Sequence, residues 1–291
     1  MEGTAMTDAE HTRPTERLWT PWRMSYIGGE TKEDGCIFCN RLQKSRDIES
    51  LILHRHEHSF VIMNLYPYNT GHIMLVPNQH ASDPAQLAPA ALSEMGALLP
   101  TLTNSLRRAL GCQGFNVGLN IGAIAGAGVE AHLHQHIVPR WQGDANFMPI
   151  LASTMTIPEL IPVTYAKLRA EIARELTGSN VVRFVLLDSG SERVLLHNGK
   201  VPEAVANPDQ QAIQAIVSSL PPHLNDFTLT GWAGLDSAAM VAPDDIVLSL
   251  TATFPDSVPV PWQLVETSDD SIDPAAREII QRAIAQRAPA R

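Results

Sequence analysis

The segment AHLHQHIVPR, residues 131–140, carries three histidines at strictly alternating positions, His132, His134 and His136. In a β-strand successive side chains point to opposite faces, so all three imidazoles would project from the same face. A helix would instead distribute the rings around its axis. Ile137 and Val138 favour a strand, and Pro139 is expected to close it. We predict a strand that presents three nitrogen bases, an array suited to metal binding, nucleophilic attack or proton transfer.

The composition predicts a packed core in one large or two ordinary domains, because the 291 residues are 44% hydrophobic and 18% charged. No uninterrupted apolar run of about 18 residues occurs, so no membrane partner is expected. The net charge of −10 argues against a nucleic-acid partner. Residues 180–291 hold 7 Lys and Arg against 14 Asp and Glu, a net of −7, which leaves −3 for residues 1–179. An anionic ligand is therefore expected in the first part, held by local dipoles.

Three segments follow from these patterns. Residues 1–17 are polar and lack the apolar core of a secretory signal, so we expect a flexible tail. Residues 18–179 form the first domain, which ends with an amphipathic helix at 158–176 and a glycine stop at Gly178. Residues 180–291 form an acidic second domain without an assigned function. Three cysteines, two of them in one C-x-x-C, do not make a disulfide framework, so a cytoplasmic setting is expected.

The first domain is expected to combine an antiparallel sheet with one long helix. Strands are predicted at 51–54, 60–64, 72–76 and 114–122, and the turn residues 66–71 connect the second strand to the third. A helix is predicted from 87 to 110, starting after Ser82–Pro84 and kinked or split at Pro100. The aromatic-rich opening at 18–27 is expected to dock on the domain or on a second subunit.

Two loops near the triple-histidine strand could contribute to a site. Residues 123–130 form a small-residue loop whose backbone N–H groups could approach an anion closely, and beside three histidines a phosphate cradle is the preferred interpretation over a simple hairpin connection. Residues 140–147 form a loop that could cover the site.

The second domain is expected to be a small α+β unit. A hairpin is predicted from 181–187 and 193–197, further strands at 246–253 and 262–265, and helices at 210–220 and 273–286. Its histidines, His197 and His223, stand alone and are interpreted as incidental. No cluster of nucleophile, base or metal ligands marks a site there.

The pair Cys36 and Cys39 could hold one metal ion on a tight turn. A redox C-x-x-C is the alternative, but it would normally open a helix in a βαβ unit, and no such unit is visible. Zinc needs two further ligands, which the downstream histidines could provide.

Several segments of the sequence together resemble a known family. The run His132–Val138 is similar to the alternating signature of the histidine-triad (HIT) superfamily, with Gln135 at a position that is usually hydrophobic. The surrounding blocks agree in order and spacing, namely Cys36–Cys39, Asn64–His72, Pro77–His80, Gly118–Asn120, the opening 19–24 and the segment 139–147. The last two resemble the bacterial diadenosine-tetraphosphate phosphorylase branch. The resemblance covers about residues 18–177.

The resemblance implies an α+β sheet domain that dimerises, with a nucleotide whose α-phosphate lies at the middle histidine. Carried onto this sequence, His134 is the nucleophile and His136 contacts the phosphate or the leaving group. Asn120 and the backbone N–H groups near Gly128 and Val129 would hold non-bridging oxygens. Asn64 would face the ribose hydroxyls.

The same resemblance implies a structural zinc ion. In zinc-bearing relatives the C-x-x-C is completed by a histidine after the second hairpin strand and by the first histidine of the triad. Mapped onto this sequence, the ligands are Cys36, Cys39, His80 and His132, a Cys₂His₂ set. Magnesium carried by the nucleotide is left open as a second ion.

The function expected from these residues is that of an enzyme, a nucleotidyl hydrolase or transferase that cleaves dinucleoside polyphosphates, foremost diadenosine tetraphosphate. Phosphate or water would resolve a nucleotidyl-histidine intermediate. Two alternatives stay open. One is a hydrolase of nucleoside phosphoramidates or adenylyl conjugates, and the other is a non-catalytic nucleotide sensor. A homodimer is the expected assembly.

Overall fold

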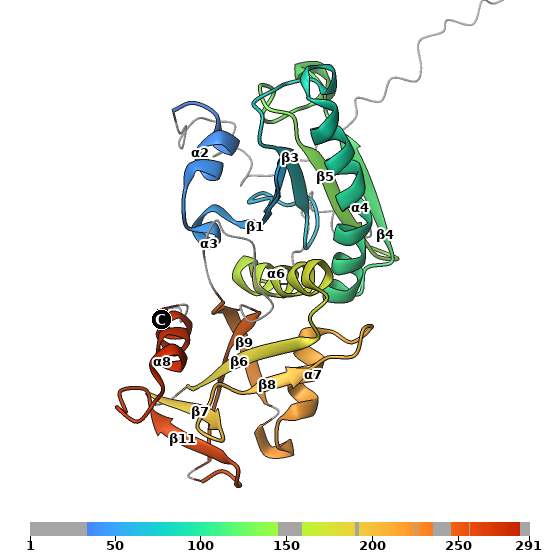
Figure 1. Cartoon of the computed structure of the whole chain (residues 1–291). Coiled ribbons are helices and arrows are strands. Elements are labelled where there is room, and N and C mark those ends of the chain that lie inside the picture. Colours follow the sequence, from blue (N-terminus) through green and yellow to red (C-terminus); the bar gives the residue numbers. More distant parts are fainter. Residues whose placement is uncertain are drawn as a thin grey trace, which may run out of the picture. The chain divides into compact units, whose positions relative to one another are not determined.

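The computed structural model describes residues 34–144, 159–189, 192–224, 226–234, 246–255 and 257–285. These residues belong to one compact unit (Figure 1). The expected flexible tail at 1–17, the aromatic opening at 18–27 and the end of the covering loop at 145–147 lie outside the described residues. The expected α+β class is confirmed. The domain boundary after residue 179 stays a prediction.

The first sheet has five antiparallel strands in the order β1-β2-β3-β5-β4. Its strands are β1 (Ile52–Arg55), β2 (Ser59–Met63), β3 (Ile73–Pro77), β4 (Gly114–Leu119) and β5 (Gln135–Arg140). The four strands predicted before the histidine segment are confirmed to within a few residues. Pairing of β3 with β5 brings the hairpin beside the triple-histidine segment, with Met74 opposite His136.

The triple-histidine strand differs from the prediction at both ends. It begins at Gln135, so His132 and His134 precede the strand and only His136 lies within it. The reason lies in the pairing, because the ladder with β3 starts at Gln135 and Leu75, whereas the N–H of Leu133 donates to the Ala81 carbonyl at 2.6 Å. Nor does Pro139 close the strand, which continues to Arg140 because β4 pairs along this end down to Gly114.

The two faces of this sheet bury different side chains. Leu53, Val61 and Ile73 belong to the larger core cluster, which also contains residues of the long helix α4 (Pro89–Leu110). The opposite face packs a smaller cluster around Phe38, a residue of the short helix α2 (Ile37–Gln43). Ile137 faces the larger cluster, so His136, its neighbour in the strand, projects toward the face that α2 covers.

The long helix forms as the sequence predicts, with one correction. Asp83 caps the 3-10 turn η1 (Pro84–Gln86) through the Ala85 N–H at 2.8 Å, and the regular helix α4 starts only at Pro89. The helix runs through Pro100 to Leu110 without the predicted split. The short helices α2 and α3 (Asp47–Ser50) were not predicted, because four to seven residues are too few for a clear periodic pattern.

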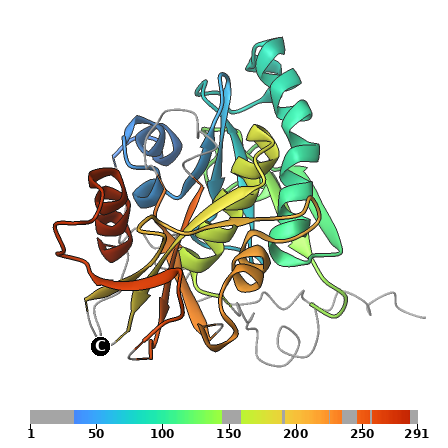
Figure 2. The same ribbon diagram turned by 60° about the horizontal axis from the view of Figure 1, so that its bottom comes forward.

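The second sheet, coloured from yellow to red in Figure 2, is mixed, with strand order β11-β7-β6-β10-β9 and β8 paired beside β6. Its strands are β6 (Val181–Asp188), β7 (Arg193–His197), β8 (Glu203–Val205), β9 (Phe227–Trp232), β10 (Val247–Ala252) and β11 (Trp262–Glu266). The predicted hairpin, strands and helices are confirmed, whereas β8 and β9 were not predicted. Strands β6 and β10 run parallel. Both faces of β6 are buried, which explains its nearly continuous apolar sequence.

Each face of this second sheet packs against helices. Phe184 and Leu186 belong to the larger core cluster with residues of α7 (Ala212–Ser219). Val185 and Leu187 face the opposite way and pack with residues of α8 (Pro274–Ala285). The N–H groups of Ala275 and Ala276 donate to the Asp273 carboxylate, which caps α8 at the start of the predicted helix.

Helix α6 (Ile161–Thr177) belongs to the core of both sheets. We predicted an amphipathic helix, but the run from Leu168 to Arg174 is buried without a break. A helix buried on all sides is one that other elements surround. Here α6 packs against α4 and β1 of the first sheet and against β9 and α7 of the second.

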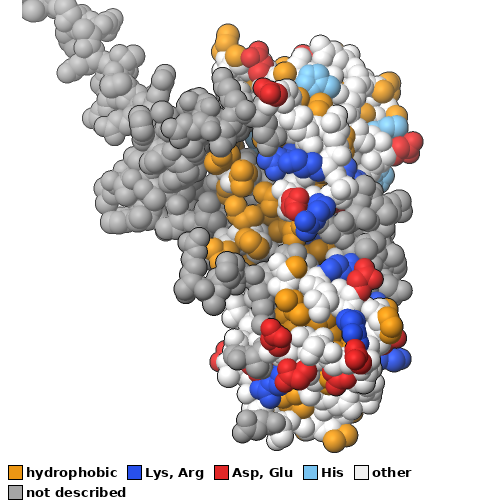
Figure 3. All heavy atoms as spheres, turned by 90° about the vertical axis from the view of Figure 1, so that its left-hand side faces the viewer, with side chains coloured by type: hydrophobic (Ala, Val, Ile, Leu, Met, Phe, Trp, Pro, Cys, Tyr) orange, Lys and Arg blue, Asp and Glu red, His pale blue; other side chains and the backbone are white. Residues whose placement is uncertain are grey.

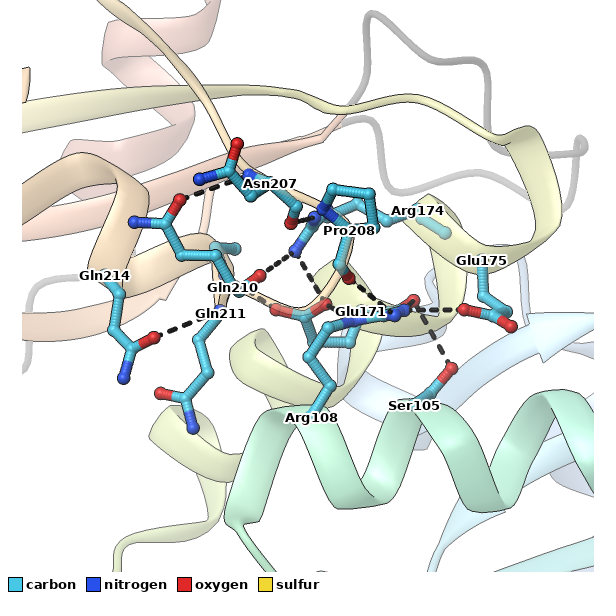
Figure 4. Close-up of polar contacts among 12 residues, drawn as sticks. Ser105, Arg108, Glu171, Arg174, Glu175, Asn207, Pro208, Gln210, Gln211 and Gln214 are labelled. Atoms are coloured by element: carbon cyan, nitrogen blue, oxygen red, sulfur yellow. Dashed lines mark hydrogen bonds and ion pairs between the residues drawn. The ribbon is translucent and has the colours of Figure 1, made fainter. Parts of the chain in front are cut away.

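A buried polar cluster joins α6 to its neighbours (Figure 4). The Glu171 carboxylate accepts hydrogen bonds from Arg108 of α4 at 2.6 Å, from Arg174 at 2.9 Å and from the Ala212 N–H at the start of α7 at 2.7 Å. Arg174 also donates to the carbonyls of Gln210 and Asn207. We call these residues, together with Ser105, Glu175 and Pro208, the Glu171 cluster.

The surface on the face drawn in Figure 3 carries Lys and Arg side chains interspersed with Asp and Glu among the described residues. Within the same residues, no helix combines the length and the apolar character that crossing a membrane requires.

Candidate functional site

Four potential metal ligands meet at one end of the first sheet. Cys36 and Cys39 come from the turn at the start of α2, His80 follows β3, and His132 precedes β5; their ligand atoms all lie within 4.8 Å of one another. The Nδ1 atom of His132 is 3.3 Å from the Cys36 sulfur and 3.6 Å from the Cys39 sulfur. The Cys39 sulfur lies 3.4 Å from Nδ1 of His80. The four ligands named from the resemblance are therefore brought together.

These separations fit a tetrahedral zinc site. Bonds of about 2.3 Å to sulfur and about 2.0 Å to nitrogen place neighbouring sulfur and nitrogen ligands about 3.5 Å apart. The Nε2 atom of His132 donates to the Pro77 carbonyl at 2.9 Å, which leaves Nδ1 unprotonated and turned toward the cysteines. Burial and the neighbouring Cys36 raise the pKa of the Cys39 thiol, a cost to a bare thiolate that a bound cation would offset. The residues present thus fit zinc.

Replacing Cys36 by serine is expected to lower the metal content from about one zinc per chain to a small fraction of that, because three ligands remain and a hydroxyl binds zinc poorly. Atomic absorption on protein prepared without chelator measures this. The control is Cys112→Ser. Cys112 is a buried free thiol just after α4 that belongs to the larger hydrophobic core cluster and is not one of the four potential metal ligands. Wild-type protein without zinc would contradict the assignment.

His134 is held in the form that a nucleophile requires. Its Nδ1 atom donates to the carbonyl of His132 at 2.9 Å, so Nδ1 carries the proton and Nε2 keeps a free electron pair. Burial lowers the pKa of His134, against the opposing effect of that hydrogen bond, which favours the neutral ring at pH 7. The chain therefore presents an unprotonated Nε2, the atom with which an imidazole attacks an electrophile.

His136 takes part in a chain of rings that the sequence did not reveal. Its Nδ1 atom is 3.0 Å from Nε2 of His72. Nδ1 of His72 accepts from the Tyr68 N–H at 3.0 Å and faces the Asn64 amide nitrogen at 3.2 Å. In the neutral rings, Nε2 of His72 then carries a proton and donates it to Nδ1 of His136. The hydrogen of His136 is left on Nε2, so His136 is a proton donor.

Backbone geometry places His72 for this contact. Gly71 has a φ of +72°, and a Cβ there would lie 2.2 Å from Leu110 of α4. Glycine thus allows both the turn and the close approach to the helix. His72 is fully buried, and its carbonyl accepts the Asn64 N–H at 3.0 Å. The sequence places His72 inside the resembling block, but nothing in the sequence predicts a role for it.

Replacing His72 by leucine is expected to lower kcat about 10- to 100-fold, since residues that orient a functional histidine typically matter on that scale. His72→Gln keeps an N–H near the position of Nε2 and is expected to recover part of the loss. Both variants require steady-state kinetics and a check of folding by circular dichroism. Equal kcat values for the leucine variant and wild type would contradict the proton assignment to His136.

The remaining predicted residues are Asn120, Gly128, Val129 and Asn64. Asn120 follows Leu119, the last residue of β4, which pairs with Gln135, the residue that follows His134. Gly128 is exposed, and Val129 packs against the cluster that contains Phe38. The Asn64 side chain contacts His72 and accepts a hydrogen bond from the Tyr66 N–H at 2.9 Å. Its amide therefore helps to hold the His72 ring that contacts His136. The ligand contacts of these residues stay predictions.

Comparisons with known proteins place the sequence among known relatives. A family model described as the HIT domain matches residues 45–143. The chain is 37% identical over 167 residues to AP-4-A phosphorylase of Mycobacterium tuberculosis, covering 55% of this chain and 86% of that protein. It is 30% identical over 105 residues to adenosine 5'-monophosphoramidase hnt1 of Schizosaccharomyces pombe, covering 36% of this chain and 74% of that protein.

Among solved structures, the chain is similar to a Zn-bound histidine triad family protein from Mycobacterium smegmatis, with 22% identity and a TM-score of 0.41. The match covers 50% of this chain and 98% of the other. The extent of the sequence match to the M. tuberculosis protein decides the assignment: this chain belongs to the HIT family.

Proposed function

We propose that the chain cleaves dinucleoside polyphosphates, with diadenosine tetraphosphate as the first candidate, through a nucleotidyl intermediate on His134. The observation that carries the proposal is the hydrogen bond from Nδ1 of His134 to the His132 carbonyl, because it leaves Nε2 free to attack. Family membership makes the chain an enzyme of the nucleotide phosphorylase or hydrolase class, as the sequence predicted. The sequence match to AP-4-A phosphorylase supports the substrate class.

The bonds and protons of the proposed reaction can be accounted for with the residues of the site. Nε2 of His134 forms a bond to the α-phosphorus while the bond to the bridging oxygen breaks. The proton on Nε2 of His136 passes to the leaving oxygen as negative charge builds on it. Phosphate or water then attacks the same phosphorus, releases His134 and returns a proton to His136. Asn120 and the N–H groups near Gly128 and Val129 would hold the non-bridging oxygens.

A bound zinc ion would have a structural part in this proposal. All four positions of its tetrahedron are filled by Cys36, Cys39, His80 and His132, so the ion would hold the α2 turn against the segment that carries His134. A need for magnesium on the substrate has no support in the residues described.

The test is incubation with diadenosine tetraphosphate, with and without inorganic phosphate, followed by chromatography of the products. ADP plus ATP only when phosphate is present indicates phosphorolysis. AMP plus ATP without phosphate indicates hydrolysis. The control enzyme carries His134→Ala. Absence of product from wild-type protein under both conditions would refute the proposed substrate.

The alternative substrate is a nucleoside phosphoramidate, which the match to an adenosine 5'-monophosphoramidase favours. The same nucleophile serves both reactions, so adenosine 5'-phosphoramidate is assayed in parallel. If it is cleaved and diadenosine tetraphosphate is not, the alternative holds. Nucleotide binding without turnover of either substrate would instead support the other alternative, a non-catalytic nucleotide sensor.

We also propose a homodimer. Strand β4 lies at the edge of the first sheet, and its residues Asn116, Val117 and Gly118 are exposed, which leaves a backbone edge available for a second copy. Analytical ultracentrifugation measures the mass of the assembly in solution.

The cytoplasmic location expected from the cysteine content stays a prediction. Cys36, Cys39 and Cys112 are all free thiols.

A further inference from the structure

The segment that carries the nucleophile lies outside the backbone ladder of the sheet. His132, Leu133 and His134 precede β5, whose ladder with β3 begins at Gln135. The described contacts of this segment include the Pro77 carbonyl at the end of β3, the Ala81 carbonyl in the connection that follows, helix α2 and the His136 ring of β5. The direction of the His134 ring must therefore be set by these neighbours.

Phe38 is the side chain through which α2 reaches this segment. It lies between Cys36 and Cys39 and is only 4% exposed. Its ring centroid is 5.1 Å from that of His134, with the rings tilted by 46°, and 5.5 Å from that of His132, edge to face at 73°. Behind Phe38 lies the apolar face of the sheet, with Phe60 and Met74 in the same cluster. The phenyl ring is thus held between a rigid sheet and the two histidines.

We infer that Phe38 is a positioning residue for His134 and that it transmits the state of the metal-ligand turn to the nucleophile. The hydrogen bond to the His132 carbonyl fixes one nitrogen but allows the ring to swing about that contact. Phe38 restricts this swing on one side, and the His136 ring, 4.8 Å away, restricts it on another. In-line attack depends on the aim of Nε2, and a misplacement of about 1 Å can cost about 100-fold in rate.

The chain offers a matched control for ordinary core packing. Phe60 of β2 belongs to the same cluster and is fully buried, but the described ring contacts of the two histidines do not include it. Phe38→Leu and Phe60→Leu remove the same atoms from the same cluster. Both should lower stability, whereas only the first should change His134.

The experiment compares these two variants with wild type in three measurements at one pH, namely zinc content, the imidazole ¹⁵N resonances and steady-state kinetics. The His134 resonances are assigned by their loss in His134→Ala. For Phe38→Leu we expect shifted His134 resonances, a kcat about 10- to 100-fold lower, a KM within about threefold of wild type, and unchanged zinc. For Phe60→Leu we expect wild-type resonances and a wild-type kcat. Equal behaviour of the two variants in resonances and kcat would overturn the inference.

The link to the metal turn has its own measurement on the wild-type chain, which does not depend on how a variant folds. Removing metal with a chelator should shift the His134 resonances, because it frees the turn that carries Phe38. Unmoved resonances in chelated protein would overturn that link. The kinetic part rests on the proposed function, but the spectra need no substrate. If wild-type protein cleaves no nucleotide and only Phe38→Leu shifts the His134 signals, the proposed function fails and the positioning role stands.

Discussion

Alanine in place of His134 is expected to lower turnover by a factor on the order of 10⁴ to 10⁶, the range seen when a nucleophile is removed from an otherwise intact enzyme site. The physical reason is that Nε2 of His134 is the atom left with a free electron pair by the hydrogen bond to the His132 carbonyl. With the ring gone, His136 can still donate its proton, but no group forms the bond to phosphorus. Nucleotide binding should change much less than kcat.

The covalent step gives this prediction a second measurement. Rapid alkaline quenching of wild-type protein during turnover, which preserves a phosphorus–nitrogen bond, followed by mass spectrometry at neutral to basic pH, should show a mass gain of one nucleotidyl group on the peptide that contains His134. The alanine variant should show none. His197→Ala is the control, because His197 lies on β7 of the second sheet, where its ring contacts that of Trp262. Undiminished turnover by the His134 variant would refute the covalent mechanism.

The metal-ligand set could be predicted, whereas the proton states of the histidine rings could not. Alternation at 132, 134 and 136 indicates a shared face, and the resemblance pairs Cys36 and Cys39 with His80 and His132, which the structure brings together. Which nitrogen of each ring carries the proton depends on single hydrogen bonds. For His134 the partner is a carbonyl two residues back, and for His136 it is His72, 64 residues away in sequence. No sequence spacing encodes such a contact.

In the fold, local patterns were reliable and long-range packing was not. Strands β1 to β4 and helix α4 follow from alternation, turn residues and helical periodicity. The start of β5 at Gln135 could not be foreseen, because it depends on where β3 stops pairing. The same limit applies to α6. Its sequence includes Arg169, Glu171 and Arg174, which would normally mark an exposed face, yet all three side chains are buried against partners from other elements.

The largest expected effect on stability concerns one of these buried charges. Glu171→Gln is expected to lower the free energy of unfolding by about 3–5 kcal/mol, the usual cost of removing one partner from a buried ion pair. Glutamine preserves the shape and can still accept the Ala212 N–H. It removes the negative charge that compensates Arg108 and Arg174, whose guanidinium groups contact the Glu171 carboxylate at 2.6 Å and 2.9 Å. Two cations would then be left with reduced compensation in the interior.

The control is Glu175→Gln, one turn further along the same helix. Glu175 also pairs with Arg108, at 2.8 Å, but its side chain is 28% exposed, so water screens the interaction. Its replacement should cost no more than about 1 kcal/mol. Urea unfolding followed by tryptophan fluorescence measures both variants, and an unchanged slope with a lower midpoint identifies a loss of stability. Equal midpoints for the two variants would contradict the importance of the buried charge.

The same unfolding curves test how the two sheets are coupled. Arg108 on α4 also donates to the Pro208 carbonyl, and Arg174 on α6 donates to the carbonyls of Asn207 and Gln210, so the Glu171 cluster connects the helices of the first sheet to the segment that leads into α7. The larger core cluster likewise contains residues from both sheets. A shared core predicts one cooperative transition for wild type and for Glu171→Gln, followed by fluorescence and by circular dichroism alike. If residues 180–291 instead fold as an independent domain, the variant should separate two transitions, since the contact between them is weakened while each core remains intact.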